Sequence, residues 1–414
     1  MNTEKQRLFR RDFTLVVIGQ IISLFGNGVL RFALPLYLLR ETGSSGLFGM
    51  VSACSFIPMI FFSLAGGVLA DRVNKRNIMA GLDFATAGLV LVFYLLHGKL
   101  PLVPLMIVCL MILYGISGAY EPAVQASIPL LVQREQIMQG NAVINMVNTL
   151  AGLLGPVIGG GLFGIGGIDP ILFISIGCFF SSAVMELFIR IPYQRKKTSE
   201  GIFTVIRADL LESWNYIRKE RTELISVVIV LALFNLVLSS ALVVGIPVMV
   251  VQVLGMSDAQ LGITQGAMGL GGLFGGLLGG VLGERFTFRK CHWILFLCSG
   301  TAALMGAALL DGVPAAWGFR IITVLCFLAM ASSTVFTVQI CTVIQQQTPP
   351  HLVGKIMAFI LAAANCAAPL GQAVYGVLFD VCSRKAWIVM FGAAGLALAI
   401  SMYSRRAFER FERS

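Results

Sequence analysis

The sequence predicts an all-α membrane protein with about twelve transmembrane helices, arranged in two six-helix bundles that are related by a parallel repeat. Of the 414 residues, 57% are hydrophobic and 12% are charged, which is about half the charged share of a soluble domain. Uncharged stretches long enough to cross a bilayer recur along the chain, and motifs of the first half return in the second. This composition excludes a soluble enzyme, a disordered tail protein and a nucleic-acid-binding protein, despite the net charge of +10.

Each half of the chain provides six spans, since one span needs about 20 apolar residues. In the first half we expect them at 13–39, 42–70, 78–97, 100–120, 136–168 and 171–189. In the second half we expect them at 224–257, 259–283, 291–310, 321–354, 356–379 and 386–404. The first apolar run is too long for a signal peptide and no small-residue cleavage site closes it, so we interpret it as the first transmembrane helix.

The basic residues predict the orientation. Most of the 30 Lys and Arg residues fall in loops on one side of this arrangement, and such loops are usually cytoplasmic. Because an even number of spans returns the chain to its starting side, we expect both termini in the cytoplasm.

A polar stretch at 190–223 separates the two sets of spans. Apolar residues recur in it at helical spacing: Phe203, Ile206, Leu210, Trp214 and Ile217. This pattern predicts an amphipathic helix on the inner membrane surface, which we interpret as a linker with no direct part in transport. The predicted domains are an N-terminal bundle at 1–190, a cytoplasmic linker at 191–222 and a C-terminal bundle at 223–414.

The two halves resemble each other at equivalent places. Pro35 in the first span matches Pro247 in the seventh, and Gly43 matches Gly255. The sequence Gly-Val-Leu-Ala-Asp-Arg starting at Gly67 returns as Gly-Val-Leu-Gly-Glu-Arg starting at Gly280. A parallel repeat of six spans is typical of transporters whose two bundles rock against each other.

The loop after the second span resembles the signature loop of the major facilitator superfamily, G-x-x-x-D-R-x-x-[KR]-[KR]. The motif positions of the first copy are held by Gly67, Asp71, Arg72, Lys75 and Arg76, and the second copy begins with Gly280, Glu284 and Arg285. The second copy differs from the pattern in two ways: Glu284 stands where the pattern has Asp, and the spacing before the next basic pair is longer. The resemblance implies that both loops latch the outward-open state and do not contact substrate.

Two further motifs lie within the first bundle. Glu121 lies at the cytoplasmic end of the fourth span, and an intramembrane carboxylate is a functional candidate. By resemblance it joins a gating relay with Arg72 or Arg76, and direct proton carriage is the alternative. Gly155 and Pro156 resemble the end of the fifth-span motif of drug:proton antiporters, although ordinary glycine packing and a proline kink explain the same residues.

The segments 122–136 and 75–83 indicate one branch of the superfamily. They look like the branch of the superfamily that holds bacterial macrolide-efflux proteins and the enterobactin exporter, and the likeness covers essentially the whole chain. It implies export across the bacterial plasma membrane.

Charged residues inside spans mark a translocation path. Asp83 lies about two turns into the third span and is our candidate for proton coupling; a structural partner for a neighbouring helix is the alternative. Related antiporters often carry an Arg in the fourth span, and none is present here. Arg31 lies in the outer half of the first span. It either lines the central cavity and favours anionic or neutral substrates, or extends to the interface near Glu41.

Uncharged polar residues in the spans complete the predicted substrate site. Besides Arg31, these candidates are Gln20, Asn27, Asn145, Asn235, Gln265, Gln339 and Asn365. Each alone is better explained by hydrogen bonds between helices than by ligand binding, but as a set they are expected to line one cavity between the halves.

We therefore predict a secondary transporter, not an enzyme, which exports small amphiphilic drugs or antibiotics of the macrolide kind by proton antiport and alternating access. The alternatives are an exporter of one anionic metabolite such as a siderophore, and a lipid-moving transporter. The expected partners are a small-molecule substrate, protons and membrane lipids, with the monomer as the functional state. No cofactor or metal is expected, because the sequence has no nucleotide-binding motif and no clustered His, Asp or Glu.

Overall fold

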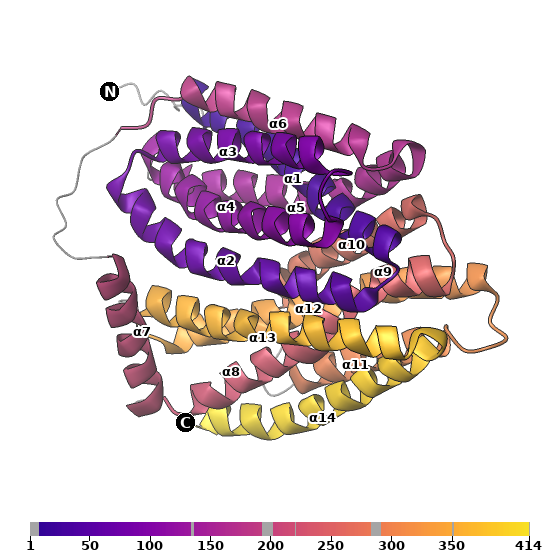
Figure 1. Ribbon diagram of the computed structural model, residues 1–414. Coiled ribbons are helices and arrows are strands. Elements are labelled where there is room, and N and C mark those ends of the chain that lie inside the picture. Colours follow the sequence, from indigo (N-terminus) through magenta and orange to yellow (C-terminus); the bar gives the residue numbers. More distant parts are fainter. Residues whose placement is uncertain are drawn as a thin grey trace. The chain divides into compact units, whose positions relative to one another are not determined.

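A computed structural model describes residues 8–133, 136–192, 202–219, 221–282, 291–349 and 352–413. These residues are almost all helical, and none of them lies in a β-strand (Figure 1). Eleven of the described helices are long and apolar enough to cross a membrane, and the apolar helix Cys291–Ala307 is shorter. The predicted all-α membrane fold of about twelve helices is confirmed.

The helices form two compact units, which we call unit 1 and unit 2. Unit 1 comprises Met1–Leu34 and Cys54–Ile202, and unit 2 comprises Pro35–Ala53 and Phe203–Ser414. The last turns of the first helix and the first turns of the second therefore belong to unit 2. The domain limits at 190 and 223 remain a prediction.

The first six helices contain most of unit 1. They are α1 (Arg11–Thr42), α2 (Ser45–Arg72), α3 (Lys75–Leu96), α4 (Leu102–Leu131), α5 (Ile137–Gly166) and α6 (Asp169–Leu187). Their apolar residues are buried toward one another, and a cluster around Phe13, Tyr120 and Ile128 fills the end of the unit at which α1 begins.

The remaining helices belong to unit 2. They are α7 (Ile202–Lys219), α8 (Glu223–Phe234), α9 (Ser240–Pro247), α10 (Asp258–Leu282), α11 (Cys291–Ala307), α12 (Ala315–Gln347), α13 (Val353–Val381) and α14 (Ala386–Arg413). A π-helical turn, η2 (Asn235–Ser239), joins α8 to α9, and a second, η3 (Val248–Val253), extends α9, so that these elements form one continuous span, Glu223–Val253. A short 3₁₀ turn, η5 (Ser383–Lys385), precedes α14.

The backbone supports the predicted repeat. Gly43 and Gly255, which match in sequence, have φ angles of +64° and +66°. A second pair, Gly98 and Gly312, follows the third helix of each half and also has positive φ, at +80° and +101°. Glycine adopts this left-handed conformation without a Cβ clash. Equivalent turns in the two halves are thus built in the same way.

Close helix crossings hold each unit together. In unit 1, a Cβ atom on Gly118 of α4 would lie 3.2 Å from the Met59 Cα of α2. In unit 2, a Cβ atom on Gly275 of α10 would lie 2.8 Å from the Ala331 Cα of α12. Small residues permit such approaches between membrane helices, whose association depends on van der Waals packing.

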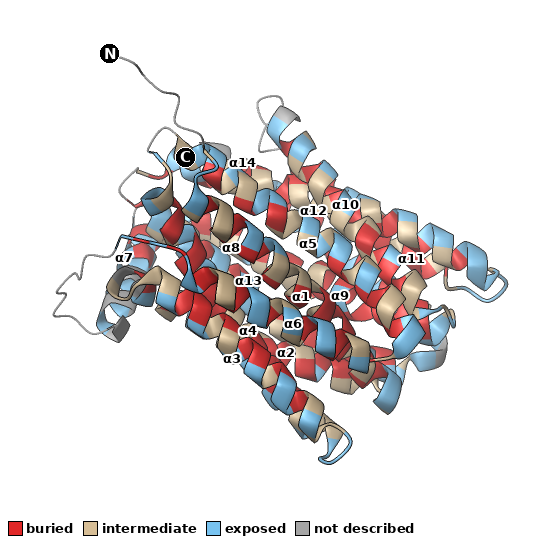
Figure 2. Ribbon diagram, turned by 90° about the horizontal axis from the view of Figure 1, so that it is seen from above, coloured by how far each residue is buried: buried red, intermediate tan, exposed pale blue. Residues whose placement is uncertain are grey.

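Large apolar side chains also cover the outside of the helices. Ile165 is 90% exposed and Leu277 is 71% exposed, and in Figure 2 buried and exposed residues alternate around individual helices such as α11. In water this surface would be costly, whereas lipid tails solvate it. The exposed apolar faces therefore fit a membrane-embedded protein.

Helix α7 packs on the beginning of α13. Lys355 Nζ donates to Glu212 Oε2 at 2.6 Å, and the Trp214 and Phe359 rings are 6.2 Å apart. Ser213 and Ile217 are buried, whereas Trp214 is largely exposed. The predicted apolar stripe is therefore divided between a packed side and an exposed one; the side chains of its other members, Phe203, Ile206 and Leu210, lie outside the described residues.

Candidate functional site

A row of polar contacts joins α1 to α4 inside unit 1. Gln20 Nε2 donates to Tyr120 Oη at 2.6 Å, and Asn27 Nδ2 donates to Ser117 Oγ at 3.1 Å. The Arg31 guanidinium lies over the Tyr114 ring, 3.9 Å from its centroid. Because Gln20, Asn27 and Arg31 recur at helical spacing, they lie on one face of α1.

Arg31 has an aromatic partner instead of an acidic one. Arg31 and Tyr114 are both partly exposed, and the Phe56 ring from α2 lies 5.6 Å from the Tyr114 ring. No ion pair to Arg31 is found in the described part of the chain. A cation held over a ring face keeps its charge and its hydrogen-bond donors for a ligand.

Two carboxyl groups are buried near the other end of this row. Asp83 of α3 is 2% exposed and Glu186 of α6 is fully buried. Ser23 Oγ donates to Asp83 Oδ1 at 3.0 Å, and Tyr120 Oη donates to Glu186 Oε1 at 2.6 Å. The second oxygen of each carboxyl group, Asp83 Oδ2 and Glu186 Oε2, has no hydrogen-bond partner.

The predicted signature loop lies at the α2–α3 junction. Asn74 caps α3 by accepting from the Arg76 backbone N–H at 3.1 Å, and the Arg76 Nη1 donates to Leu187 O of α6 at 3.5 Å. The close approach of α2 to α4 occurs at Gly66, where a Cβ atom would lie 2.8 Å from the Ala119 Cα, whereas Gly67 is exposed and faces open space.

Other predicted motif residues are distributed around this junction. Arg72 and Lys75 are partly exposed, and Glu121 is exposed with no ion pair in the described residues. Gly280 faces open space on α10. The side chain of Asp71, together with Glu284 and Arg285, lies outside the described residues.

The fifth-span motif forms a close crossing with α1. A Cβ atom on Gly155 would lie 2.9 Å from the Gly28 Cα, and Pro156 lies inside the continuous helix α5. This contact lies one residue after Asn27, so the glycine pair sets how closely α5 approaches the polar face of α1.

The predicted amides occupy different environments. Gln20 and Gln339 are buried, Asn27, Asn235 and Gln265 are partly buried, and Asn145 and Asn365 are exposed. Gln339 Nε2 has no hydrogen-bond partner. The Asn235 carbonyl accepts from Ser240 Oγ at 2.8 Å within the π-helical turn η2. Unit 1 thus brings Gln20 and Asn27 together with Arg31, and the other amides are spread over α5, η2, α10, α12 and α13.

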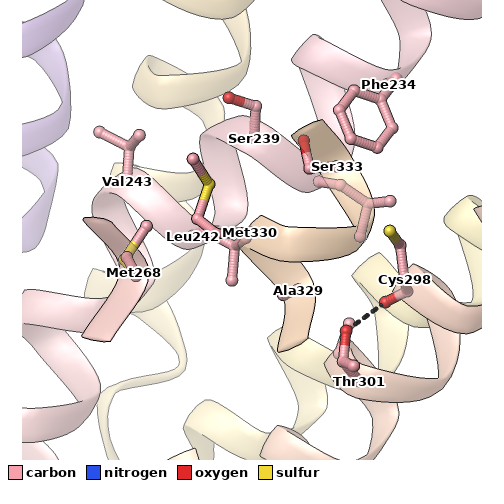
Figure 3. A pocket seen from close by; sticks show the side chains of 12 residues that line it. Phe234, Ser239, Leu242, Val243, Met268, Cys298, Thr301, Ala329, Met330 and Ser333 are labelled. Atoms are coloured by element: carbon pink, nitrogen blue, oxygen red, sulfur yellow. Dashed lines mark hydrogen bonds between the residues drawn. The ribbon is translucent and has the colours of Figure 1, made fainter. Parts of the chain in front are cut away.

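Unit 2 contains an apolar cavity of about 160 Å³ (Figure 3). Its walls come from α8, η2, α9, α10, α11 and α12: Phe234, Leu238, Ser239, Leu242, Val243, Met268, Cys298, Thr301, Ala302, Ala329, Met330 and Ser333. The hydroxyls of Ser239 and Ser333 form no hydrogen bond within the described residues, whereas Thr301 Oγ1 donates to Cys298 O at 2.8 Å. The cavity therefore offers apolar walls with two hydroxyls that remain available to a ligand.

Sequence reasoning missed Glu186, Tyr120 and the cavity. Glu186 was detectable as the single acidic residue in the interior of the sixth apolar run, and Tyr120 as the neighbour of Glu121. The cavity has no such signal, because Met, Leu and Ala occur throughout membrane helices. Within the described residues, no group of three His, Cys, Asp or Glu side chains is placed to hold a metal ion.

The pattern of the Major Facilitator Superfamily matches residues 16–371. The chain belongs to this superfamily. Macrolide efflux protein A of Streptococcus pyogenes is 24% identical over 408 residues, which cover 96% of each chain. The enterobactin exporter EntS of Shigella boydii is 30% identical over 158 residues, or 38% of each chain. The predicted membership, including the likeness to these two kinds of exporter, is confirmed.

Solved structures agree on the fold. The nucleoside transporter NupG superposes with a TM-score of 0.77 over 96% of this chain and 99% of its own, at 13% identity. A bacterial homologue of the iron transporter ferroportin, in the inward-facing state, superposes with a TM-score of 0.72 over 95% of this chain and 98% of its own, at 16% identity. The protein is an integral membrane transporter of this superfamily.

Proposed function

We propose that the protein exports small amphiphilic drugs or antibiotics of the macrolide kind by proton antiport and alternating access. The observation that carries this proposal is the likeness to macrolide efflux protein A, which extends over 96% of both chains. The transporter would act as a monomer in the bacterial plasma membrane, surrounded by lipid, with both termini in the cytoplasm.

The cavity of unit 2 supports the proposal that the substrate is bulky and apolar. Drug-sized ligands occupy pockets of about 300 to 1,000 Å³, so a cavity of about 160 Å³ holds only part of such a molecule. Apolar walls with the free hydroxyls of Ser239 and Ser333 suit a hydrocarbon portion that carries a few oxygens. The π-helical turn η2 borders this cavity, and such turns often occur at functional sites.

In this proposal Asp83 binds the coupling proton, and the predicted polar residues take part in substrate binding. The two signature loops, Glu121 and the Gly155–Pro156 pair control the change between inward-open and outward-open states. The interactions of Arg76 with the end of α6 agree with such a structural role.

Export of an anionic metabolite is the second candidate, and Arg31 is the observation that favours it. This cation lacks an acidic partner in the described residues and is partly exposed over Tyr114. A carboxylate or phenolate on the substrate would supply the missing charge.

The test is the accumulation of radiolabelled erythromycin in cells that express the protein, with and without a protonophore. We expect expression to lower accumulation, and the protonophore to remove the difference. Unchanged accumulation of erythromycin and of a chemically broad drug panel would contradict drug export. The same assay with a labelled catecholate siderophore then tests the second candidate, for which Arg31→Ala is expected to abolish export.

A further inference from the structure

The carboxyl pair of unit 1 has an unusual environment for two acidic residues inside a transporter. Asp83 and Glu186 come from neighbouring helices, and each is almost completely buried. Both belong to one group of hydrogen-bonded side chains that joins α1, α3, α4 and α6, yet no salt bridge to either one is found in the described residues. An uncompensated charge inside a membrane protein is expensive, so this arrangement needs a cation that the chain itself does not supply.

The hydrogen bonds show where that cation binds. Tyr120 has one hydroxyl hydrogen, which it donates to Glu186 Oε1 while accepting from Gln20. Ser23 donates to Asp83 Oδ1. The two remaining carboxyl oxygens, Glu186 Oε2 and Asp83 Oδ2, are buried and without partners. A proton on either of them needs no rearrangement of the surrounding donors.

The other groups around the pair are neutral or lie at the surface. Helix α1 contributes Gln20 and Ser23, α4 contributes Tyr120, α6 contributes Ser182, and α5 has no titratable residue in its described sequence. Arg76, at the start of α3, donates to the backbone carbonyl of Leu187 and not to a carboxylate. Glu121 is exposed. A single proton is therefore the smallest change that relieves the repulsion between the two carboxylates.

We propose that Glu186 is a second proton-binding residue, which shares one coupling proton with Asp83, and that Tyr120 and Gln20 are positioning residues that report the presence of this proton to α1. The inference rests on the proposed proton antiport and deepens it, because it adds the partner of Asp83 and the route to the polar face of α1.

The geometry gives a simple cycle. A proton from water binds one carboxylate, and the pair then carries one negative charge in total. When that proton leaves to water, both groups are ionised and repel each other across the α3–α6 contact. Within one turn of α1, Ser23 donates directly to Asp83, and Gln20 donates to Tyr120, which in turn donates to Glu186. Arg31 and Asn27 lie on the same face of α1, so a shift of this helix reaches the residues proposed to meet substrate.

Infrared spectroscopy of the purified protein in lipid nanodiscs tests proton sharing without any substrate. We expect a carboxylic acid carbonyl band that titrates with pH. In both Glu186→Gln and Asp83→Asn, the midpoint of this titration should differ from that of the wild type by at least tenfold in proton concentration. Asp311→Asn is the matched control, because this exposed aspartate lies in the turn between α11 and α12 of unit 2, and its band should equal that of the wild type. A band that is unchanged in Glu186→Gln overturns the proposal.

Transport measurements in proteoliposomes distinguish proton binding by Glu186 from the positioning role of Tyr120. We expect Glu186→Gln to retain exchange of erythromycin across the membrane and to lose accumulation driven by a pH gradient. Glu186→Asp should restore part of it, and Tyr120→Phe should shift the pH profile of transport without changing erythromycin affinity. Driven accumulation at the wild-type level in Glu186→Gln overturns the inference. If the wild type does not move erythromycin, the proposed drug export fails, while the infrared result still decides proton sharing.

Discussion

The two halves of the chain share their turns, and the two units differ in their interiors. In the register set by Pro35 and Pro247, Asn27 and Arg31 of α1 correspond to Ser239 and Val243. In unit 1 these side chains contact Ser117 and Tyr114 of α4. In unit 2 the corresponding side chains line the apolar cavity. The same face of equivalent spans is therefore polar and filled in one unit, and apolar and hollow in the other.

This comparison shows which backbone features are retained in both copies of the repeat. Left-handed glycines recur at Gly43 and Gly255, and close crossings of the second and fourth helices recur in both units. In unit 1 the glycines at this crossing come from both helices, Gly66 of α2 and Gly118 of α4, whereas in unit 2 Gly275 of α10 packs against Ala331 of α12. Backbone geometry is thus shared, while the side chains differ, and our proposals assign proton binding to unit 1 and apolar substrate contact to unit 2.

The largest effect is expected at the α10–α12 crossing. Gly275→Val places a side chain against the backbone of Ala331, whose Cα lies 2.8 Å from a Cβ atom at this position. Overpacking of this kind costs about 1 to 3 kcal/mol or more. We expect a large loss of thermal stability, measured by melting of the purified protein in detergent.

Gly276→Val is the matched control for this prediction. It lies next to Gly275 on the same helix, but a Cβ atom there meets only Thr334 Cγ2, at 4.0 Å. Equal melting temperatures for the two variants would contradict the account of the crossing.

Substrate charge gives the next largest effect. If the substrate is anionic, Arg31→Ala should weaken its binding about tenfold or more, since hydrogen bonds to charged groups contribute about 1.5 to 3 kcal/mol. Neutral substrates should lose much less. The measurement is equilibrium binding of an anionic and a neutral probe of similar size, with Tyr114→Phe as the variant that keeps the ring under the cation. Equal losses for the two probes would show that Arg31 acts through folding and not through charge.

Filling the cavity tests the apolar half of the comparison. Ser333→Leu and Ser239→Leu each place a larger apolar side chain in the cavity of about 160 Å³. Cavity filling commonly stabilises a protein by about 0.5 to 2 kcal/mol, so we expect unchanged or higher melting temperatures together with reduced erythromycin transport. Normal transport by both variants would exclude the cavity from the substrate path.

The smallest effect concerns the matched turns. Gly43→Ala and Gly255→Ala should each lower the unfolding free energy by about 1 kcal/mol, because alanine disfavours positive φ. Gly67→Ala should leave the unfolding free energy unchanged or raise it, since Gly67 lies in a helix, where alanine is favoured over glycine, and its Cβ would meet open space. Thermal denaturation of the three variants checks this order. A loss of unfolding free energy in Gly67→Ala as large as in the other two variants would contradict the placement of Gly67 in open space.

The sequence was sufficient for the fold, because spans and repeats are one-dimensional patterns. It also identified Gln20, Asn27, Arg31 and Asp83, since a polar residue in an apolar run is visible without a structure. It did not pair Asp83 with Glu186, because the pairing depends on which helices are neighbours. The cavity was equally hidden: its lining residues are ordinary in a membrane helix, and only the packing of several helices leaves the space.

The most direct test of the central claim is erythromycin transport into proteoliposomes under an imposed proton gradient, compared between the wild type, Glu186→Gln and Ser333→Leu. We predict that the wild type accumulates erythromycin only while the gradient lasts. Glu186→Gln should exchange erythromycin without accumulating it, and Ser333→Leu should be reduced in both exchange and accumulation. Accumulation by the wild type without a proton gradient, or identical behaviour of the two variants, would contradict a division of proton and substrate chemistry between the units.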